Sequence, residues 1–293
     1  MRIGVLIFSL PKDELSAGAE RLLEAAAQRD HELTRIYEPY LSFVETNKGI
    51  GVFYENLPLP NFDVIIPRPN FIEEPSLHTV TTDLLVRAGY RVLNKQPTFS
   101  LSKNKLAQHA RLTAAGIAMP RWAIARTPEA AWDAAQKIGL PIVIKTAFGT
   151  WGKGVFYADS SETFHPIVDY LNVRDGNPVI VEKFVAEANR KDLRVIVIGG
   201  KIIAAMERTA REGDIRANAS IGGVGSKVAL SEEEKQIAIA ATASLELDIA
   251  GVDILRSNRG PLVIEVNSNP GLKEIERASG VDVAGAIIEF ATN

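Results

Sequence analysis

The chain has 293 residues, of which 46% are hydrophobic and 24% charged, a balance typical of a folded globular protein with two or three domains. It has no cysteine, which excludes disulfides, thiolate catalysis, iron–sulfur clusters and cysteine zinc sites. The formal net charge is −3, so the composition gives no general indication of nucleic-acid binding.

The N-terminal segment predicts a buried strand rather than a membrane anchor. Its apolar run ends at Ser9, which is too short for a spanning helix, and a small-residue cleavage site is missing. We therefore expect a cytoplasmic protein that does not bind membranes. The histidines occur in no HxxxH or HxH spacing, so we expect surface or helix residues rather than metal ligands: His31, His78, His109 and His165.

Strand and helix patterns alternate through the first third of the chain, and the first strand–helix loop has neither a GxGxxG nor a GxxxxGK[ST] motif. This alternation predicts a parallel α/β sheet, a Rossmann-type layer without a dinucleotide or P-loop site. The expected order is a strand over 3–8, a helix over 14–29, a strand over 33–39, an irregular stretch, a strand over 62–67, a helix over 79–89 and a strand over 91–94.

The pattern changes near residue 95, and the last third contains two hairpins. Their turn signals are Gly199-Gly200 and Asn258-Arg259-Gly260. The other expected elements are a helix over 101–115, a strand over 120–125, a helix opened by the cap Thr127-Pro128-Glu129, a strand ending at Lys145, a strand over 155–158, a helix over 232–247 and a closing helix. We place the domains at 1–94, 95–182 and 183–293.

The second hairpin predicts a metal site. Because strands alternate faces, Glu265 and Asn267 share one face, and the turn brings Asp253 across from Glu265. Two carboxylates this close repel unless a cation lies between them, and a set of carboxylate and amide oxygens suits Mg²⁺. The alternative is a solvated sheet face, which the apolar character of the hairpin disfavours.

The loop 148–154 contains three glycines and follows the strand that ends in Lys145. Glycines let backbone N–H groups approach an anion and let a loop close as a lid, and a lysine is a point charge suited to phosphate oxygens. The alternative is an ordinary turn beside a solvated lysine. Together with a Mg²⁺ site, the loop favours binding of a nucleoside triphosphate.

The segment 190–216 has seven basic and four acidic residues, a net charge of +3 in a chain of −3. Arg216 at the end of this segment, and Asn218 just after it, suit contacts to a phosphate or a carboxylate substrate. An ordinary charged hairpin and loop would have the same composition.

A strand-end lysine, a glycine-rich lid, two hairpins and the D…E-x-N set together resemble the ATP-grasp superfamily. The sequence is most similar to the RimK-type glutamate ligases, which add glutamate to the C-terminus of a ribosomal protein. The stretches that carry the resemblance are IVIKTAFGTWGKGV, AAMERTAREGDIRAN and DIAGVDILRSNRGPLVIEVNSNPGL. The resemblance implies an α/β (α+β) ATP-grasp fold with an N-terminal Rossmann-like pre-ATP-grasp domain.

The resemblance also implies an ATP-dependent acid–amino-acid ligase that forms an amide through an acyl phosphate. The implied cofactors are ATP and Mg²⁺, with Mn²⁺ as a possible replacement. The implied substrates are an amino acid such as glutamate and a carboxylate acceptor such as an acidic protein C-terminus. The resemblance also implies a dimer or tetramer of the chain. Direct nucleic-acid binding is not implied.

The resemblance assigns roles to individual residues, some of which the residue patterns above already indicate. The catalytic pair is Arg216 and Asn218, which face the phosphates or the acyl phosphate, and the metal ligands are Asp253, Glu265 and Asn267. The nucleotide is bound by Lys105 and Lys145 at the phosphates, Asp192 at the ribose, the lid glycines Gly149, Gly152 and Gly154, and the adenine segment Glu182, Lys183 and Phe184.

Two departures from the family pattern concern the adenine and acceptor sites. Glu182-Lys183 stands where the family usually has Gln-Glu, and Ala-Ser-Ile-Gly-Gly follows Asn218 where the ribosomal-protein ligase has a basic His-Arg-Gly-Gly type sequence. Other acceptors therefore stay open: a pterin or deazaflavin coenzyme, or an amino-group carrier protein of lysine or arginine biosynthesis. A non-catalytic nucleotide-binding domain is the alternative outside the enzyme class.

Overall fold

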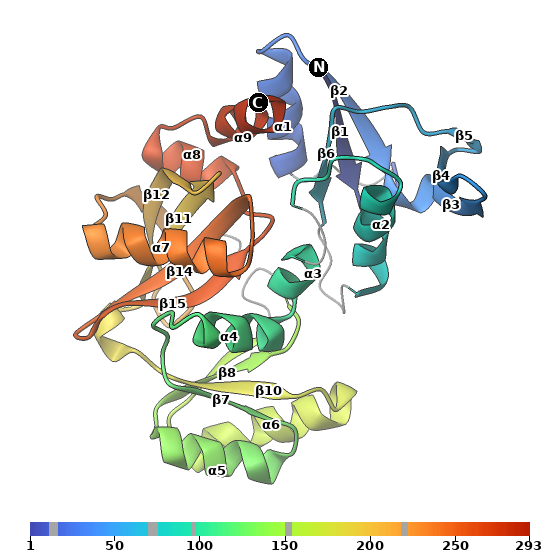
Figure 1. The fold of residues 1–293 in the computed structure, drawn as a ribbon. Coiled ribbons are helices and arrows are strands. Elements are labelled where there is room, and N and C mark those ends of the chain that lie inside the picture. The colour runs from blue at the N-terminus through green and yellow to red at the C-terminus, as the bar shows by residue number, and fades with distance from the viewer. Residues whose placement is uncertain (12–16, 70–75, 95–97, 150–153, 218–221) are drawn as a thin grey trace.

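The structure is a computed structural model that describes residues 1–11, 17–69, 76–94, 98–149, 154–217 and 222–293. Three main sheets and a small fourth one follow each other along the chain, and helices cover them (Figure 1). Among the described residues, no helix is long and apolar enough to cross a bilayer.

The N-terminal unit is built on a parallel sheet of order β2-β1-β6, which confirms the predicted α/β layer. Its strands and helices are β1 (Arg2–Ile7), α1 (Ala17–Ala27), β2 (Glu32–Tyr37), β6 (Val64–Arg68) and α2 (Ser76–Arg87). The segment expected to be irregular instead contains the short helix η1 (Glu38–Tyr40) and an antiparallel sheet of β3 (Leu41–Thr46), β4 (Gly49–Tyr54) and β5 (Leu57–Pro58). The strand expected over 91–94 is only a bridge from Val92 to Ile65.

The helix expected over 101–115 is wrong in one respect, because Asn104 divides it. The two helices are α3 (Thr98–Lys103) and α4 (Lys105–Ala114). Asn104 has an extended backbone, and its side chain accepts hydrogen bonds from the amides of Leu106 and Ala107. Such an N-cap starts a new helix, and it places Lys105 at the first position of α4.

The central unit is an antiparallel sheet of order β7-β10-β8-β9, with two helices packed on one face. Its elements are β7 (Trp122–Ala125), α5 (Pro128–Ile138), β8 (Ile142–Thr146), β9 (Val155–Ala158), α6 (Ser161–Asp175) and β10 (Val179–Lys183). Thr127 caps α5 as predicted, since its hydroxyl accepts from the amide of Ala130.

The C-terminal unit has a five-stranded antiparallel sheet of order β13-β12-β11-β14-β15. Its elements are η2 (Ala186–Ala188), β11 (Lys191–Ile198), β12 (Lys201–Thr209), β13 (Val224–Lys227), α7 (Glu232–Ser244), β14 (Ile249–Ser257), β15 (Gly260–Asn267), α8 (Lys273–Ser279) and α9 (Val283–Thr292). Both predicted hairpins are confirmed, β11–β12 around Gly199-Gly200 and β14–β15 around Asn258-Arg259.

The N-terminal and C-terminal units share a core. Helices α1 and α9 lie side by side, and Ile3 and Leu22 belong to the same buried cluster as Ile196 and Ile288 (Figure 1). Arg21 adds ion pairs of 2.8 Å to Glu276 and Asp282 across this junction. The central unit has its own core, separate from the core that the other two units share.

Candidate active site

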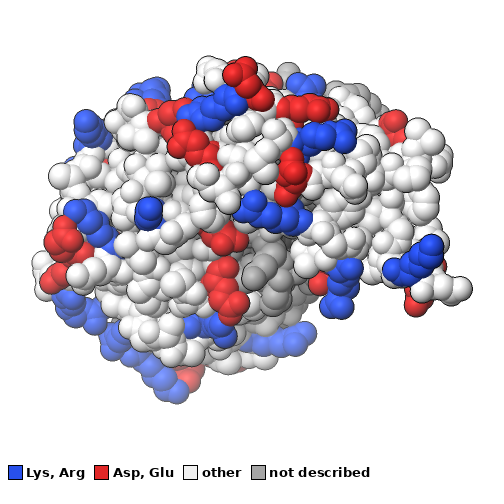
Figure 2. Space-filling model, turned by 45° about the horizontal axis from the view of Figure 1, so that its top comes forward, with Lys and Arg blue, Asp and Glu red and all other residues white. Residues whose placement is uncertain are grey.

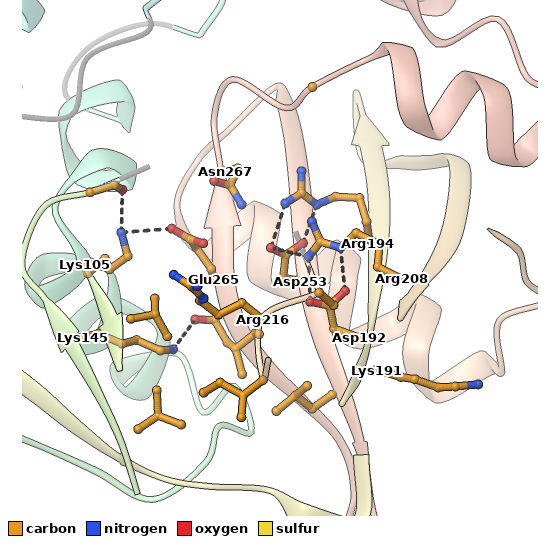
Figure 3. A pocket seen from close by; sticks show the side chains of 18 of the residues that line it. Lys105, Lys145, Lys191, Asp192, Arg194, Arg208, Arg216, Asp253, Glu265 and Asn267 are labelled. Carbon is orange, nitrogen blue, oxygen red and sulfur yellow. Dashed lines mark hydrogen bonds and ion pairs between the residues drawn. The ribbon is translucent and has the colours of Figure 1, made fainter. Parts of the chain in front are cut away.

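A pocket of about 720 Å³ lies where the central sheet faces the C-terminal sheet (Figure 3). It brings together nearly all predicted site residues that the structure describes: Lys105, Lys145, Gly149, Glu182, Lys183, Phe184, Asp192, Arg216, Asp253, Glu265 and Asn267. Gly154 lines a neighbouring hollow that Arg216 also lines. Gly152 and Asn218 lie outside the described residues.

On the central sheet, the pocket wall carries a buried chain of charges. Lys145 on β8 forms an ion pair of 2.7 Å with Glu182 on β10, and the other carboxylate oxygen of Glu182 lies 2.6 Å from Nε2 of His109. Burial alone would raise the pKa of Glu182, but Lys145 and His109 lower it to about 2. The pair fixes Lys145 at the pocket, where its Nζ also donates to the carbonyl of Ile264 at 3.4 Å.

Lys105 joins the helix α4 to the facing strand β15. Its Nζ lies 3.3 Å from Oε1 of Glu265 and donates to the carbonyl of Gly149 at 2.9 Å (Figure 3). Burial disfavours the charge on Glu265, yet the neighbouring Lys105 keeps its pKa below the ordinary value. The break at Asn104 therefore has a functional result, since it directs the first residue of α4 at the predicted metal ligand.

The predicted metal ligands lie on one face of the β14–β15 hairpin. Asp253 pairs directly with Glu265, and Asn267 pairs with Gly251 one step along the same face. The amide nitrogen of Asn267 donates to the carbonyl of Gly251 at 3.4 Å. This hydrogen bond uses the nitrogen of the side-chain amide and does not involve its oxygen.

This donor set fits a hard divalent cation. Glu265 has one oxygen beyond its contact to Lys105, and Asn267 has an amide oxygen, both of the ligand type that Mg²⁺ prefers. Asp253 is shared, because its two oxygens also accept from Arg194 and Arg208. Its pKa is lowered: burial opposes ionisation, but the two guanidinium groups outweigh it.

On the same face of the sheet, and starting from Asp253, four alternating charges form a buried cluster: Asp192, Arg194, Arg208 and Asp253. Arg208 donates to both oxygens of Asp192 at 2.6 and 2.8 Å, and Arg194 donates to both oxygens of Asp253, the Nη2 contact being 2.8 Å. Cross-strand register produces this, since Asp192 lies opposite Arg208 and Arg194 lies opposite Asp253. Burial, followed by repulsion from Asp253, keeps the pKa of Asp192 raised despite Arg208.

The remaining basic residues of the segment 190–216 are mostly paired as well. Arg216 projects into the pocket and contacts Asp214 at 2.9 Å, while Lys191 points away from the pocket and contacts Glu207 at 2.7 Å (Figure 3). Charges of both signs also alternate over the face shown in Figure 2. Glu207 and Asp214 are already counted in the net charge of +3, so these two pairs do not lower it. Arg194 and Arg208 are buried with Asp192 and Asp253 in a neutral cluster, which leaves five basic and three acidic residues, a net charge of +2, on the rest of the segment.

Two contacts were not foreseen from the sequence. His109 is a helix residue, as one of the expectations had it, but it is buried on α4 against Glu182, and the two residues, 73 positions apart, gave no local signal of this contact. Lys183 lines the pocket, but its Nζ donates to the carbonyls of Gly139 and Leu140, both at 2.9 Å, just after the end of α5. The side chain of Lys183 thus orders the segment that borders the pocket.

Comparison with known proteins agrees with this fold. The structure resembles a RimK domain ATP-grasp protein from Sphaerobacter thermophilus (TM-score 0.73, 22% identity, 99% of this chain and 100% of that one). It also resembles the ATP-grasp ligase PsnB complexed with a minimal precursor (TM-score 0.75, 20% identity, 99% and 98%). The fold is thus that of the ATP-grasp proteins, as predicted.

The sequence comparisons are more specific. Residues 102–291 match the RimK-like ATP-grasp domain. The chain is 36% identical over 283 residues to ribosomal protein bS6–L-glutamate ligase from Escherichia coli O7:K1, covering 96% of this chain and 93% of that protein. The protein of the same name from Escherichia coli K12 is 35% identical over the same length. The chain belongs to the RimK-like ATP-grasp family and is an ATP-dependent ligase, as the sequence predicted.

Proposed function

We propose that the chain adds an amino acid, glutamate in the first instance, to a carboxylate at the end of a protein or peptide. The observation that carries this proposal is the meeting of Lys105, Lys145, Glu265 and Asn267 in one pocket, from separate elements. Two lysines beside hard oxygen donors suit a triphosphate whose charge must be neutralised during phosphoryl transfer. The relatives' names supply the substrate class: one of them is a glutamate ligase for a ribosomal protein.

The proposed reaction has two steps. The acceptor carboxylate attacks the γ-phosphorus of ATP, so that ADP leaves and an acyl phosphate forms. The amine of the incoming amino acid then attacks the acyl carbon, inorganic phosphate leaves and the amine loses one proton. A bound Mg²⁺ would be held by Glu265 and Asn267 with Asp253, and it would neutralise developing phosphate charge.

The chain's own residues have distinct proposed roles. Lys105 and Lys145 hold phosphate oxygens, Asp192 faces the ribose, and the backbone of Glu182 to Phe184 borders the adenine. Arg216 approaches the phosphates from the segment that also holds Asn218. The glycines at 149, 152 and 154 form the lid, which excludes water from a hydrolysable acyl phosphate. Mn²⁺ in place of Mg²⁺ and a dimer or tetramer belong to the same proposal.

The test is a ligation assay with ATP, Mg²⁺, a panel of amino acids and acceptor peptides with acidic, neutral and basic C-termini, read by mass spectrometry. We expect a mass increase of one amino-acid residue, largest with glutamate and an acidic C-terminus. Lys145→Met should abolish product, whereas Lys235→Met, which removes an exposed lysine paired with Glu232 on α7, should not. ATP-dependent ligation of glutamate to a pterin, a deazaflavin or a carrier protein, with no peptide product, would replace the proposed acceptor.

A further inference from the structure

The pocket extends to the carboxyl end of β6, where it meets a buried arginine. Arg68 is the last residue of β6 and is only 7% exposed. Its Nη2 donates to the carbonyl of Pro270 at 3.1 Å, but its buried Nε has no hydrogen-bond partner among the described residues. No described carboxylate forms an ion pair with it, and burial lowers its pKa to about 10. A buried guanidinium that meets no carboxylate in the described part of the chain is costly unless a ligand supplies one.

The start of helix α1 adds to the positive potential around Arg68. A Cβ placed on Gly18 would overlap Nη2 of Arg68, so the guanidinium packs against the first turn of the helix. The first amides of a helix carry partial positive charge and favour an anion nearby. Gly18 and Arg68 both line the pocket, so the positive potential faces its interior.

Lys103 brings a second cation to the same end of the pocket. It is the last residue of α3, lines the pocket, and forms no ion pair with a described carboxylate. Burial lowers its pKa to about 8; Glu265 opposes this shift, while Lys105 and Arg68 add to it. Lys103 therefore lies within electrostatic reach of both Arg68 and the metal face, and it connects the two parts of the pocket.

The site around Arg68 is held by hydrogen bonds between distant segments. Arg68 bonds Pro270, and the side chain of Asn269 donates to the carbonyl of Pro69 at 2.6 Å. These contacts tie the end of β6 to the loop that follows the metal strand β15. The oxygen of Asn269 is buried and has no partner among the described residues, so this polar corner has a free acceptor as well as free donors.

We propose that Arg68 and Lys103 form a subsite for the α-carboxylate of the incoming amino acid. A planar carboxylate suits a guanidinium and an ammonium group. The free oxygen of Asn269 can accept from the substrate's α-amino group. The subsite lies beside Lys105 and Glu265, so an amino acid bound there directs its amine toward the acyl phosphate. The inference rests on the proposed function, since it assigns the amine substrate of that same reaction.

The experiment compares Arg68→Met and Lys103→Met with the control Arg21→Met, whose guanidinium is paired with Glu276 and Asp282 outside the pocket. We expect each subsite variant to raise the KM for glutamate about 10- to 100-fold, as loss of a hydrogen bond to a charged group does, with an unchanged KM for ATP. Arg68→Lys should recover part of the loss. Arg68→Met should keep or increase the Tm, because it removes a buried charge that forms no ion pair among the described residues, and Arg21→Met should lower the Tm at an unchanged KM.

A binding measurement separates this inference from the proposed function. Calorimetry with glutamate, glutamate α-amide and inorganic phosphate, each without acceptor, reads the subsite directly. Weaker glutamate binding in Arg68→Met, with the α-amide binding poorly to both proteins, supports the subsite even if no peptide is ligated. Equal glutamate affinity in Arg68→Met and the wild type overturns it. So does a loss of phosphate or ATP binding alone, which would make it a phosphate site.

Discussion

The charged side chains at the two ends of the pocket differ in whether they form ion pairs. Toward β11 and β12, Asp192, Arg194, Arg208 and Asp253 satisfy each other through paired contacts. Toward β6, Arg68 is buried beside the start of α1 and Lys103 lies half-buried at the end of α3, and neither has a carboxylate partner among the described residues. Both ends line the same pocket, and both contain basic side chains.

The difference indicates two uses of buried charge. A paired cluster holds its members in one geometry before any substrate arrives, which favours precise placement of the strands that carry Asp253 and Glu265. Unpaired cations cost stability until a ligand neutralises them, so they suit substrate binding. The following predictions test this contrast, from the largest expected effect to the smallest.

Breaking the paired cluster should have the largest effect on stability. Arg208→Met leaves Asp192 buried without its partner, and breaking a buried pair in this way costs about 3–5 kcal/mol. The free energy of unfolding from urea titration measures the loss. The double variant Arg208→Met with Asp192→Leu should recover much of it, because no charge is then left alone. If Arg208→Met has the same free energy of unfolding as Arg68→Met, the paired end and the β6 end of the pocket do not differ in the way proposed.

Glu265→Gln should abolish most activity with little effect on stability. The substitution keeps the size of the side chain but removes the charge shared between Lys105 and a bound cation. We expect kcat to fall by about two to three decades, similar to the loss of one strong transition-state stabiliser. Glu246→Gln, which removes an exposed carboxylate that pairs with Arg111, is the control and should keep normal turnover. Normal turnover in Glu265→Gln would remove the metal assignment.

The lid should fail when Gly154 is replaced. Gly154 has a φ of +83°, and an added Cβ would overlap the hydroxyl of Thr146, so Gly154→Val strains the backbone where the proposed lid ends and β9 begins. We expect about tenfold more phosphate released per ligated product, because water reaches the acyl phosphate. Gly116→Val, at a helix end with a φ of +71° and open space around it, is the matched control and should stay coupled. Unchanged coupling in Gly154→Val would show that the lid lies elsewhere.

Glu182 predicts a defined dependence of stability on pH. Its folded-state pKa of about 2 lies below the ordinary 4.5, since Lys145 and His109 outweigh the effect of burial. The stabilisation is therefore complete above pH 4.5 and is lost as the pH falls toward 2. Unfolding titrations should show that Glu182→Gln removes part of this acid-side slope, at most about 1.4 kcal/mol per pH unit. A wild-type slope in the variant would mean that Glu182 does not titrate with folding.

Local rules predicted a large part of the fold and the metal face. The hairpin turns are set by Gly199-Gly200 and Asn258-Arg259, and the shared face of Asp253, Glu265 and Asn267 follows from the two-residue period of a strand. The break at Asn104 was missed because helix-forming residues surround it, although Asn is a known N-cap residue.

Pairing over long sequence distances could not be predicted. Nothing near His109 indicates that it meets Glu182, and nothing near Arg68 indicates that no carboxylate faces it. The basic segment 190–216 was read from its net charge alone, which does not show that Arg194 and Arg208 are neutralised by Asp192 and Asp253. Because Asp192 is already counted in the +3 and Asp253 is not, composition overestimated the charge outside this buried cluster by one, +3 against +2.

That correction leads to the smallest expected effect, the salt dependence of acceptor binding. If the whole +3 of the segment faced solvent, raising the salt concentration would strongly raise the KM for an acidic peptide, because steering is screened beyond about 8 Å at physiological ionic strength. In the structure, Arg194 and Arg208 are buried in a neutral cluster with Asp192 and Asp253, so a net charge of +2 rather than +3 is left on the rest of the segment to attract the acceptor. We expect the KM for an acidic peptide to rise less than about twofold between low and physiological salt, with an unchanged kcat. Steady-state kinetics with acidic and neutral peptides of equal length measures this difference. A steep rise for the acidic peptide alone would show that the paired arginines open to meet the acceptor, and the paired end of the pocket would then take part in substrate binding.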